Sequence, residues 1–205
     1  MTQVVTKFYK DEHEADQRIF ELKLTRKGLN AVRQIARHYS GTANPFFPAN
    51  AAGTFSYQYG VWALREQFVG KVWQVDRFGG VECIRNDKEK IRIGFCNVDL
   101  TCDDEHPPKP RSEKGAGAER ATQSSLFEGM EQVAQLPLGE WSFYYFMLDQ
   151  DGKAELTWPV VHGGKFAGFV ERIYLHEGSD DEIANLSLDD GDVADGFDPQ
   201  VARKS

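Results

Sequence analysis

Aspartate and glutamate are absent from residues 22 to 65, although the whole chain has a formal net charge of −8. The same segment holds six basic residues, so its formal charge is +6. These residues are Lys23, Arg26, Lys27, Arg33, Arg37 and Arg65. Charges sorted along a chain in this way attract a charged partner more strongly than the same charges interspersed. The absence of acids here predicts an anionic partner, and nucleic acid in particular.

Cysteine and long apolar runs are also scarce. Three cysteines, Cys83, Cys96 and Cys102, are too few for a secreted disulfide framework, and this favours a reducing compartment. No run approaches the roughly 20 apolar residues that span a bilayer, and the first residues lack the hydrophobic region of a signal peptide. We therefore expect a cytoplasmic protein that does not act at a membrane.

Complete catalytic signatures are missing from the sequence. It contains neither a Gly-x-Ser-x-Gly elbow nor a Walker phosphate-binding motif, and no Cys-x-x-Cys pair suggests zinc. A PD-(D/E)xK nuclease pattern on Asp76 and Glu82 fails because Ile84 stands where lysine is required. We assign no catalytic residue and predict neither a metal nor a cofactor. Enzyme activity stays open, with a non-enzymatic role favoured.

Acidity is concentrated at the carboxyl end of the chain. Residues 177 to 199 contain nine acids and no base, and the net charge of residues 177–205 is −7. Residues 1–176 are therefore almost neutral, at −1, and we expect them to form a single domain. The tail lacks hydrophobic periodicity, so we expect a disordered acidic segment. It binds a protein complex, or it competes with nucleic acid for the basic residues of the domain.

Hydrophobic periodicity predicts an α+β fold in which antiparallel sheet sections pack against two or three helices. Residues 17–24 alternate as a strand does, and Thr25 is a helix N-cap for a helix that continues to Gly41. A second helix, over residues 54–68, is apolar on most sides and is expected deep in the core. Strand patterns cover 72–76, 81–85, 90–100, 141–148, 154–161 and 165–175, and a short helical pattern lies near 126–136.

The helix after Thr25 is the first candidate site, because its helical spacing places three arginines on one side. Cationic side chains neutralise phosphates and release condensed counterions. The candidate contacts to DNA or RNA are Lys23, Arg26, Lys27, Arg33 and Arg37. The alternative is a solvated helix face whose basic side chains form ion pairs with acidic residues elsewhere in the fold.

Aromatic residues follow this basic helix. Phe46 and Phe47 stand in a loop rich in proline and glycine, and Tyr57 and Tyr59 stand in the next helix. Such rings stack on unpaired bases when they are exposed, and belong to the core when they are buried.

A polar insertion at about 101–125 is the second candidate site. Its cations, Lys109, Arg111, Lys114 and Arg120, surround a Gly-Ala-Gly step. Glycines let backbone amides approach a phosphate while the cations supply charge. The alternative is a surface loop without a ligand. Together the two candidates predict a nucleic-acid-binding protein, or an accessory protein of a nucleic-acid-handling complex.

Two other functions are compatible with the sequence. Four carboxylates and an imidazole lie between Asp99 and His106, where oxygen ligands can hold Mg²⁺ or Mn²⁺ in a metal-dependent phosphodiesterase or nuclease. Acids at a strand end also form ordinary turns, which is the simpler interpretation of this cluster. The third function is that of a scaffold or inhibitor acting through the acidic tail.

Overall fold

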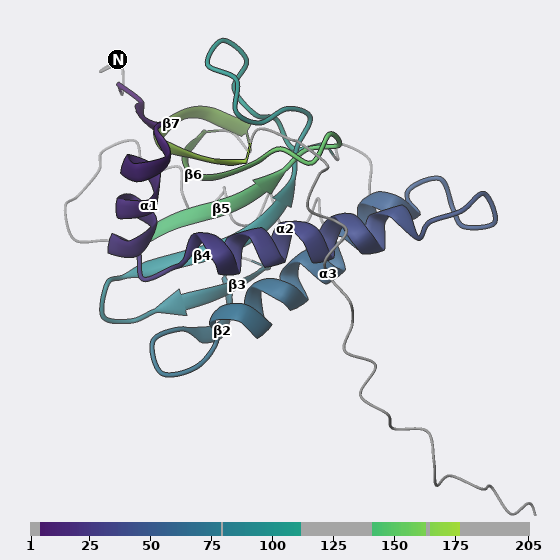
Figure 1. Cartoon of the computed structure of the whole chain (residues 1–205), viewed down its shortest axis with the longest axis horizontal. Helices are drawn as coiled ribbons and strands as arrows, with labels where there is room; N and C mark the ends of the chain where they lie inside the picture. Colours follow the sequence, from purple (N-terminus) through teal and green to yellow (C-terminus); the bar gives the residue numbers. More distant parts are fainter. Residues whose placement is uncertain (1–4, 79, 112–140, 163–164, 177–205) are drawn as a thin grey trace, which may run out of the picture.

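The computed structural model describes residues 5–78, 80–111, 141–162 and 165–176. In this part of the chain three helices pack on one face of a seven-stranded sheet, so the fold is α+β as predicted (Figure 1). The helices are α1 (Glu12–Glu21), α2 (Arg26–Gly41) and α3 (Ala51–Phe68). The strands are β1 (Lys7–Tyr9), β2 (Gln74–Phe78), β3 (Val81–Asn86), β4 (Ile91–Asn97), β5 (Ser142–Leu148), β6 (Ala154–His162) and β7 (Lys165–His176). The acidic tail and the helical pattern near 126–136 lie outside the described residues.

The sheet has the order β1-β7-β6-β5-β4-β3-β2. The two predicted antiparallel sections, β2 to β4 and β5 to β7, are confirmed. They join through a parallel pairing of β4 with β5, and β1 adds a second parallel pair beside β7. Because β4 and β5 are parallel, their carboxyl ends, at Asn97 and Leu148, lie next to each other. Ligands of sheets with parallel strands bind beyond such ends.

The strand predicted at residues 17–24 is wrong, because most of this segment belongs to α1 and the turn after it. The N-cap of the helix is Asp11, whose side chain accepts hydrogen bonds from two first-turn amides at 3.0 and 3.1 Å. Ala15, Ile19 and Leu22 are buried at helical spacings of four and three. The N-cap and this spacing outweigh the short alternation that suggested a strand.

Both helices predicted after Thr25 are confirmed. Thr25 caps α2 by accepting a hydrogen bond from the Gly28 amide at 3.1 Å. Helix α3 begins at Ala51, three residues before its expected start, and buries only one side. Gly60 lies against the sheet, whereas Trp62 is 49% exposed. The expectation that α3 lies deep in the core is therefore wrong for its outer side.

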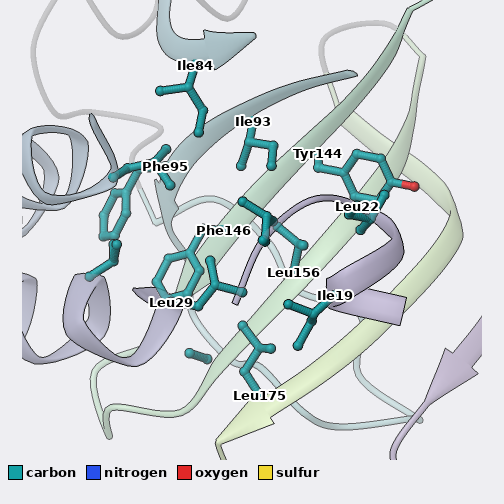
Figure 2. Close-up of a cluster of buried hydrophobic side chains, with 14 of the residues drawn as sticks. Ile19, Leu22, Leu29, Ile84, Ile93, Phe95, Tyr144, Phe146, Leu156 and Leu175 are labelled. Carbon is teal, nitrogen blue, oxygen red and sulfur yellow. The ribbon is translucent and has the colours of Figure 1, made fainter. Parts of the chain in front are cut away.

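The main core lies between the helices and the sheet. Figure 2 shows side chains of α1, α2 and the turn between them meeting the residues that five strands, β3 to β7, present to the helices. They include Ile19, Leu22, Leu29, Ile84, Ile93, Phe95, Tyr144, Phe146, Leu156 and Leu175. A second buried cluster, with Cys83, Cys96, Tyr145, Met147 and Phe169 among its members, lies on the opposite face of the sheet. Burial on both faces explains why β5 is a continuous apolar run and does not alternate.

Candidate anion-binding pocket

A pocket of about 370 Å³ lies where the carboxyl ends of β4 and β5 meet the end of α2 and the start of α3. Its lining is mainly polar and brings together two of the predicted contact residues, Arg37 and Arg111. The lining residues are Arg37, Ser40, Gly41, Ala52, Gly53, Ser56, Asn97, Arg111, Leu148, Asp149 and Gln150.

Arg37 is positioned by the turn between β5 and β6. Gly152 in this turn has a φ of +83°, and a Cβ placed on it would lie 2.5 Å from Nε of Arg37. The backbone conformation therefore favours glycine, and any larger residue would displace the guanidinium group from this position. One helical turn before Arg37, the buried Arg33 donates to the Gly152 carbonyl at 3.2 Å. Both arginines contact the turn, but only Arg37 lines the pocket.

Arg111 is positioned by a segment that runs back beside β4. Its amide donates to the Asn97 carbonyl at 3.1 Å. Its guanidinium group donates to the side-chain oxygen of Gln150 when that amide is oriented with its oxygen toward the arginine. Because Gln150 belongs to the same β5–β6 turn that contacts Arg37, one turn brings both guanidinium groups to the pocket.

Asn97 connects the end of β4 to the first turn of α3. Its Oδ1 accepts from the Ser56 hydroxyl at 2.7 Å, and its Nδ2 donates to the Gly53 carbonyl at 2.9 Å. The N-cap residue of α3, Asn50, makes no side-chain hydrogen bond to the helix. The amides of Ala52 and Gly53 at the pocket therefore have no capping side chain from Asn50. Backbone amides at a helix start add to the attraction of the two arginines for an anion.

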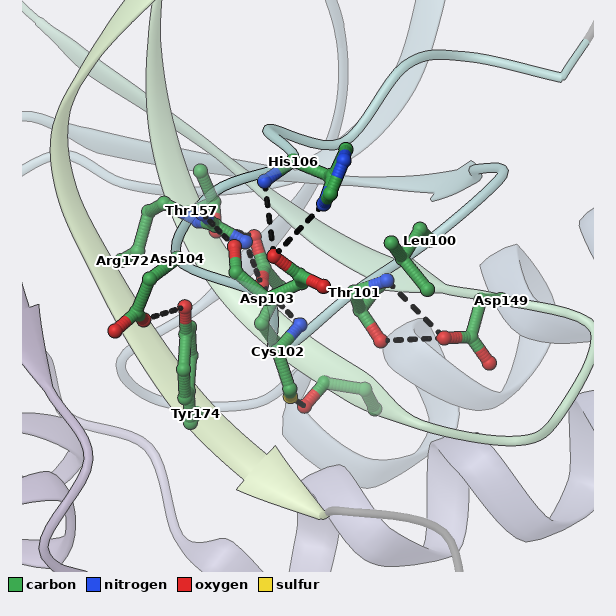
Figure 3. Close-up of polar contacts among 12 residues, drawn as sticks. Leu100, Thr101, Cys102, Asp103, Asp104, His106, Asp149, Thr157, Arg172 and Tyr174 are labelled. Atoms are coloured by element: carbon green, nitrogen blue, oxygen red, sulfur yellow. Dashed lines mark hydrogen bonds and ion pairs between the residues drawn. The ribbon is translucent and has the colours of Figure 1, made fainter.

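Asp149 is the one acid among the lining residues that the structure describes. Its Oδ2 accepts from the amide and the hydroxyl of Thr101 at 3.1 and 2.8 Å (Figure 3). Its Oδ1 accepts from the Lys153 amide at 2.9 Å. The buried carboxylate is thus engaged on both oxygens and holds the turn in shape. Two guanidinium groups and one carboxylate give the described lining residues a net positive formal charge.

The remaining cations of the predicted basic helix do not join this pocket. Arg26 forms an ion pair with Asp16 of α1 and donates to the Leu175 carbonyl at 2.6 Å. Lys23 and Lys27 are exposed near the start of α2. Ten residues separate Lys27 from Arg37, which is about 15 Å along a helix. The helix therefore presents separate cations and not one continuous basic stripe.

The cations of the polar insertion are only partly described. Lys109 is exposed, and its amide donates to Asp99 Oδ1 at 2.8 Å. Lys114 and Arg120 lie outside the described residues, as does the Gly-Ala-Gly step between them. Thr101, the first residue of the predicted insertion, is buried. The first part of the insertion is consequently packed against the sheet.

The acids between Asp99 and His106 form a hydrogen-bonded turn (Figure 3). Asp103 accepts from the His106 amide at 2.9 Å, and this bond lowers the pKa of the carboxyl group below its ordinary value. The Tyr174 hydroxyl donates to Asp104 at 2.8 Å. Within the described ranges, no three His, Cys, Asp or Glu side chains form a group suited to a metal ion. The geometry gives the nuclease alternative no support.

A buried ion pair, which the sequence did not lead us to expect, fixes the same turn. Arg172 donates to Glu155 through Nε at 3.0 Å and through Nη2 at 2.7 Å. Its Nη1 donates to the Asp103 carbonyl at 2.7 Å. The Cys102 amide donates to Glu155 at 2.9 Å, and burial raises the pKa of the Cys102 thiol to about 12. Cys102 is therefore protonated at neutral pH and is not an activated nucleophile.

Comparison with known proteins does not assign the pocket, because no family model, no curated protein and no solved structure matches this chain. Within the part of the chain that the structure describes, no helix has both the length and the apolar character needed to cross a bilayer. The inference about function therefore rests on the geometry and charge of the pocket.

Proposed function

We propose that this protein binds nucleic acid and that the pocket holds one phosphate group of the bound strand. The observation that carries the proposal is the convergence of Arg37 and Arg111 on one pocket, from α2 and from the segment after β4. A guanidinium group presents paired N–H donors that match two phosphate oxygens. The predicted basic helix thus supplies one phosphate contact, Arg37, and the predicted insertion supplies another, Arg111, at the pocket that both line.

A phosphodiester suits this pocket in charge and in hydrogen bonding. The lining residues that the structure describes carry a formal net charge of +1, from two arginines and Asp149, and a phosphodiester carries one negative charge. Ser40 and Ser56 add hydroxyl groups, and the first turn of α3 adds backbone amides. These donors supplement the guanidinium groups around an oxyanion.

The same lining favours binding over catalysis. None of the described lining residues is a histidine, cysteine or lysine, and both oxygens of Asp149 already accept hydrogen bonds. A general base needs a free position toward the proton that it removes. We therefore propose a binding or accessory role, with chemistry on the nucleic acid left to a partner.

The first test is to replace Arg37 and Arg111 singly by glutamine. Each replacement should lower the affinity for a 20-nucleotide oligonucleotide about tenfold or more, because a hydrogen bond to a charged group contributes about 1.5–3 kcal/mol. Each should also reduce the slope of log affinity against log salt concentration by about 0.7–0.9, the value for one phosphate. Fluorescence anisotropy at several KCl concentrations measures both quantities.

Lys27→Gln is the matched control, because it removes the same charge from the far end of α2. It should change the affinity less than either arginine variant. An equal loss in all three variants would indicate diffuse electrostatic attraction without a specific pocket. Unchanged affinity in correctly folded Arg37→Gln and Arg111→Gln would overturn the proposed function.

Gly152→Ala should weaken the same binding without changing any charge. The new methyl group displaces the Arg37 guanidinium from its present position, and the positive φ costs about 1–2 kcal/mol of stability in an L-residue. We expect the oligonucleotide affinity to fall several-fold, by up to about the tenfold of a lost arginine contact. Gly168→Ala adds a methyl group in open space and should leave the affinity unchanged. Equal affinities of the two variants would show that the position of Arg37 does not matter.

A further inference from the structure

We infer that the bound nucleic acid is single-stranded and that Phe46 stacks on an unpaired base beside the phosphate in the pocket. This inference rests on the proposed function and names the class of strand that the pocket accepts. It starts from the loop between α2 and α3, which joins the two helical walls of the pocket. Gly41, the last residue of α2, and Ala52, in the first turn of α3, both line the pocket.

Phe46 lies at the middle of this loop and is 99% exposed. Figure 1 shows the loop projecting away from the sheet at the shared end of α2 and α3. Its neighbour Phe47 is 44% exposed and turns toward α3, where its ring meets Phe55 edge-on at 5.2 Å. An apolar ring wholly in water is unfavourable, whereas stacking on a base would remove one face of it from water.

The loop holds Phe46 outward through local hydrogen bonds. The Phe46 amide donates to Asn44 Oδ1 at 3.0 Å, and the Phe47 amide donates to the Asn44 carbonyl at 3.0 Å. Pro45 and Pro48 on either side restrict the backbone further. Little conformational freedom is therefore lost when a partner contacts the ring.

Phe46 is within reach of nucleotides next to the pocket. It follows Gly41 by five residues, and five residues of extended chain span at most about 17 Å. A strand with one phosphate between Arg37 and Arg111 can therefore place a neighbouring base at Phe46. The two guanidinium groups of the nearby pocket favour a nucleic acid over an apolar protein segment as the occupant.

Stacking selects single strands because the bases of a duplex already stack on each other. An aromatic side chain can stack on an unpaired base regardless of its identity, since every base has a π face. The expected recognition is therefore tolerant of sequence and intolerant of pairing. DNA and RNA strands should both satisfy this stacking requirement.

The test compares Phe46→Ala, Phe46→Leu and Phe46→Trp in the full chain, with a 20-nucleotide single strand and the corresponding duplex as probes. Phe46→Ala and Phe46→Leu should lower the single-strand affinity about five- to 100-fold, the range for one stacked base. Phe46→Trp should retain the affinity, because its ring also stacks. The salt dependence should be unchanged in all three variants, since none removes a phosphate contact.

Phe20→Ala is the matched control, because Phe20 is 73% exposed but lies on α1. It should bind as the unmodified chain does. Duplex binding as tight as single-strand binding, or full affinity of Phe46→Ala, would overturn this inference. If the two pocket arginine variants lose affinity while Phe46→Ala does not, the proposed function stands without the stacking contact. If the arginine variants also keep full affinity, the proposed function fails first.

Discussion

Arg172→Met is expected to lower the free energy of unfolding by about 3–5 kcal/mol, because it leaves the Glu155 carboxylate buried without its partner. Arg172 is enclosed by the rings of Phe8, Phe169 and Tyr174, whose centroids lie 5.3 to 5.6 Å from its Cζ. Because the two side chains are only 2% and 0% exposed, solvent contact is too small to compensate the charge that remains. Removing the Arg172 guanidinium group should also leave the Asp103 carbonyl without this donor and loosen the turn that contains Cys102.

Urea unfolding monitored by circular dichroism measures this change. Arg77→Gln serves as the control, since it breaks an exposed pair with Glu82 at 3.3 Å and should alter stability by less than about 0.5 kcal/mol. The double variant Arg172→Met, Glu155→Leu should recover part of the loss, because it removes both charges together. A thiol reagent should label Cys102 faster in Arg172→Met. Equal stabilities of Arg172→Met and Arg77→Gln would contradict the buried pair.

Gly60→Val should destabilise the protein by about 1–3 kcal/mol, the range for an overpacked core. A Cβ on Gly60 would lie 2.6 Å from Cδ2 of Phe95, whose ring is buried and stacks on Phe146 at 5.8 Å. The ring cannot move aside, so α3 must shift away from β4. This contact sets the distance between the helix and the sheet on which the pocket depends.

Thermal unfolding of Gly60→Val and Gly53→Ala compares two glycines of the same helix. A Cβ on Gly53 meets no atom within 4 Å, so Gly53→Ala should stabilise the helix by up to about 1 kcal/mol. Opposite signs for the two variants are the expected result. Gly60→Val as stable as the unmodified protein would mean that α3 does not pack closely on β4.

Local patterns predicted most of the fold. Six strands and two helices follow from alternation, helical spacing and turn residues, each within a few positions of its observed bounds. The parallel pairing of β4 with β5 could not be predicted, because it depends on contacts between segments about 45 residues apart and no local signal specifies them. The segment 17–24 was misassigned since its short alternation matched a strand, while the cap at Asp11 lay before the pattern.

The candidate site was predictable only in its charges. Arg37 and Arg111 were found from the distribution of basic residues, but Asn97, Asp149 and Gly152 acquire their roles from the meeting of β4 and β5. The absence of acids within residues 22 to 65 also suggested that Arg26 was available to an anionic partner. This suggestion was misleading, because Arg26 forms an ion pair with Asp16 of the preceding helix. Glu155 and Arg172 did carry a signal, since charged residues inside apolar strand patterns are expected to pair when buried.

Chemical-shift mapping with a short single-stranded oligonucleotide tests the central claim most directly, that one phosphate binds in the pocket between α2, α3 and the β5–β6 turn. In two-dimensional amide spectra of the full chain, the largest shifts should appear at Gly53, Arg111 and Gln150, and in Arg111→Gln the shifts at Gly53 and Gln150 should need about tenfold more oligonucleotide to develop. Shifts centred on Lys23 and Lys27, or no shifts at oligonucleotide concentrations that saturate other single-strand binders, would contradict the account.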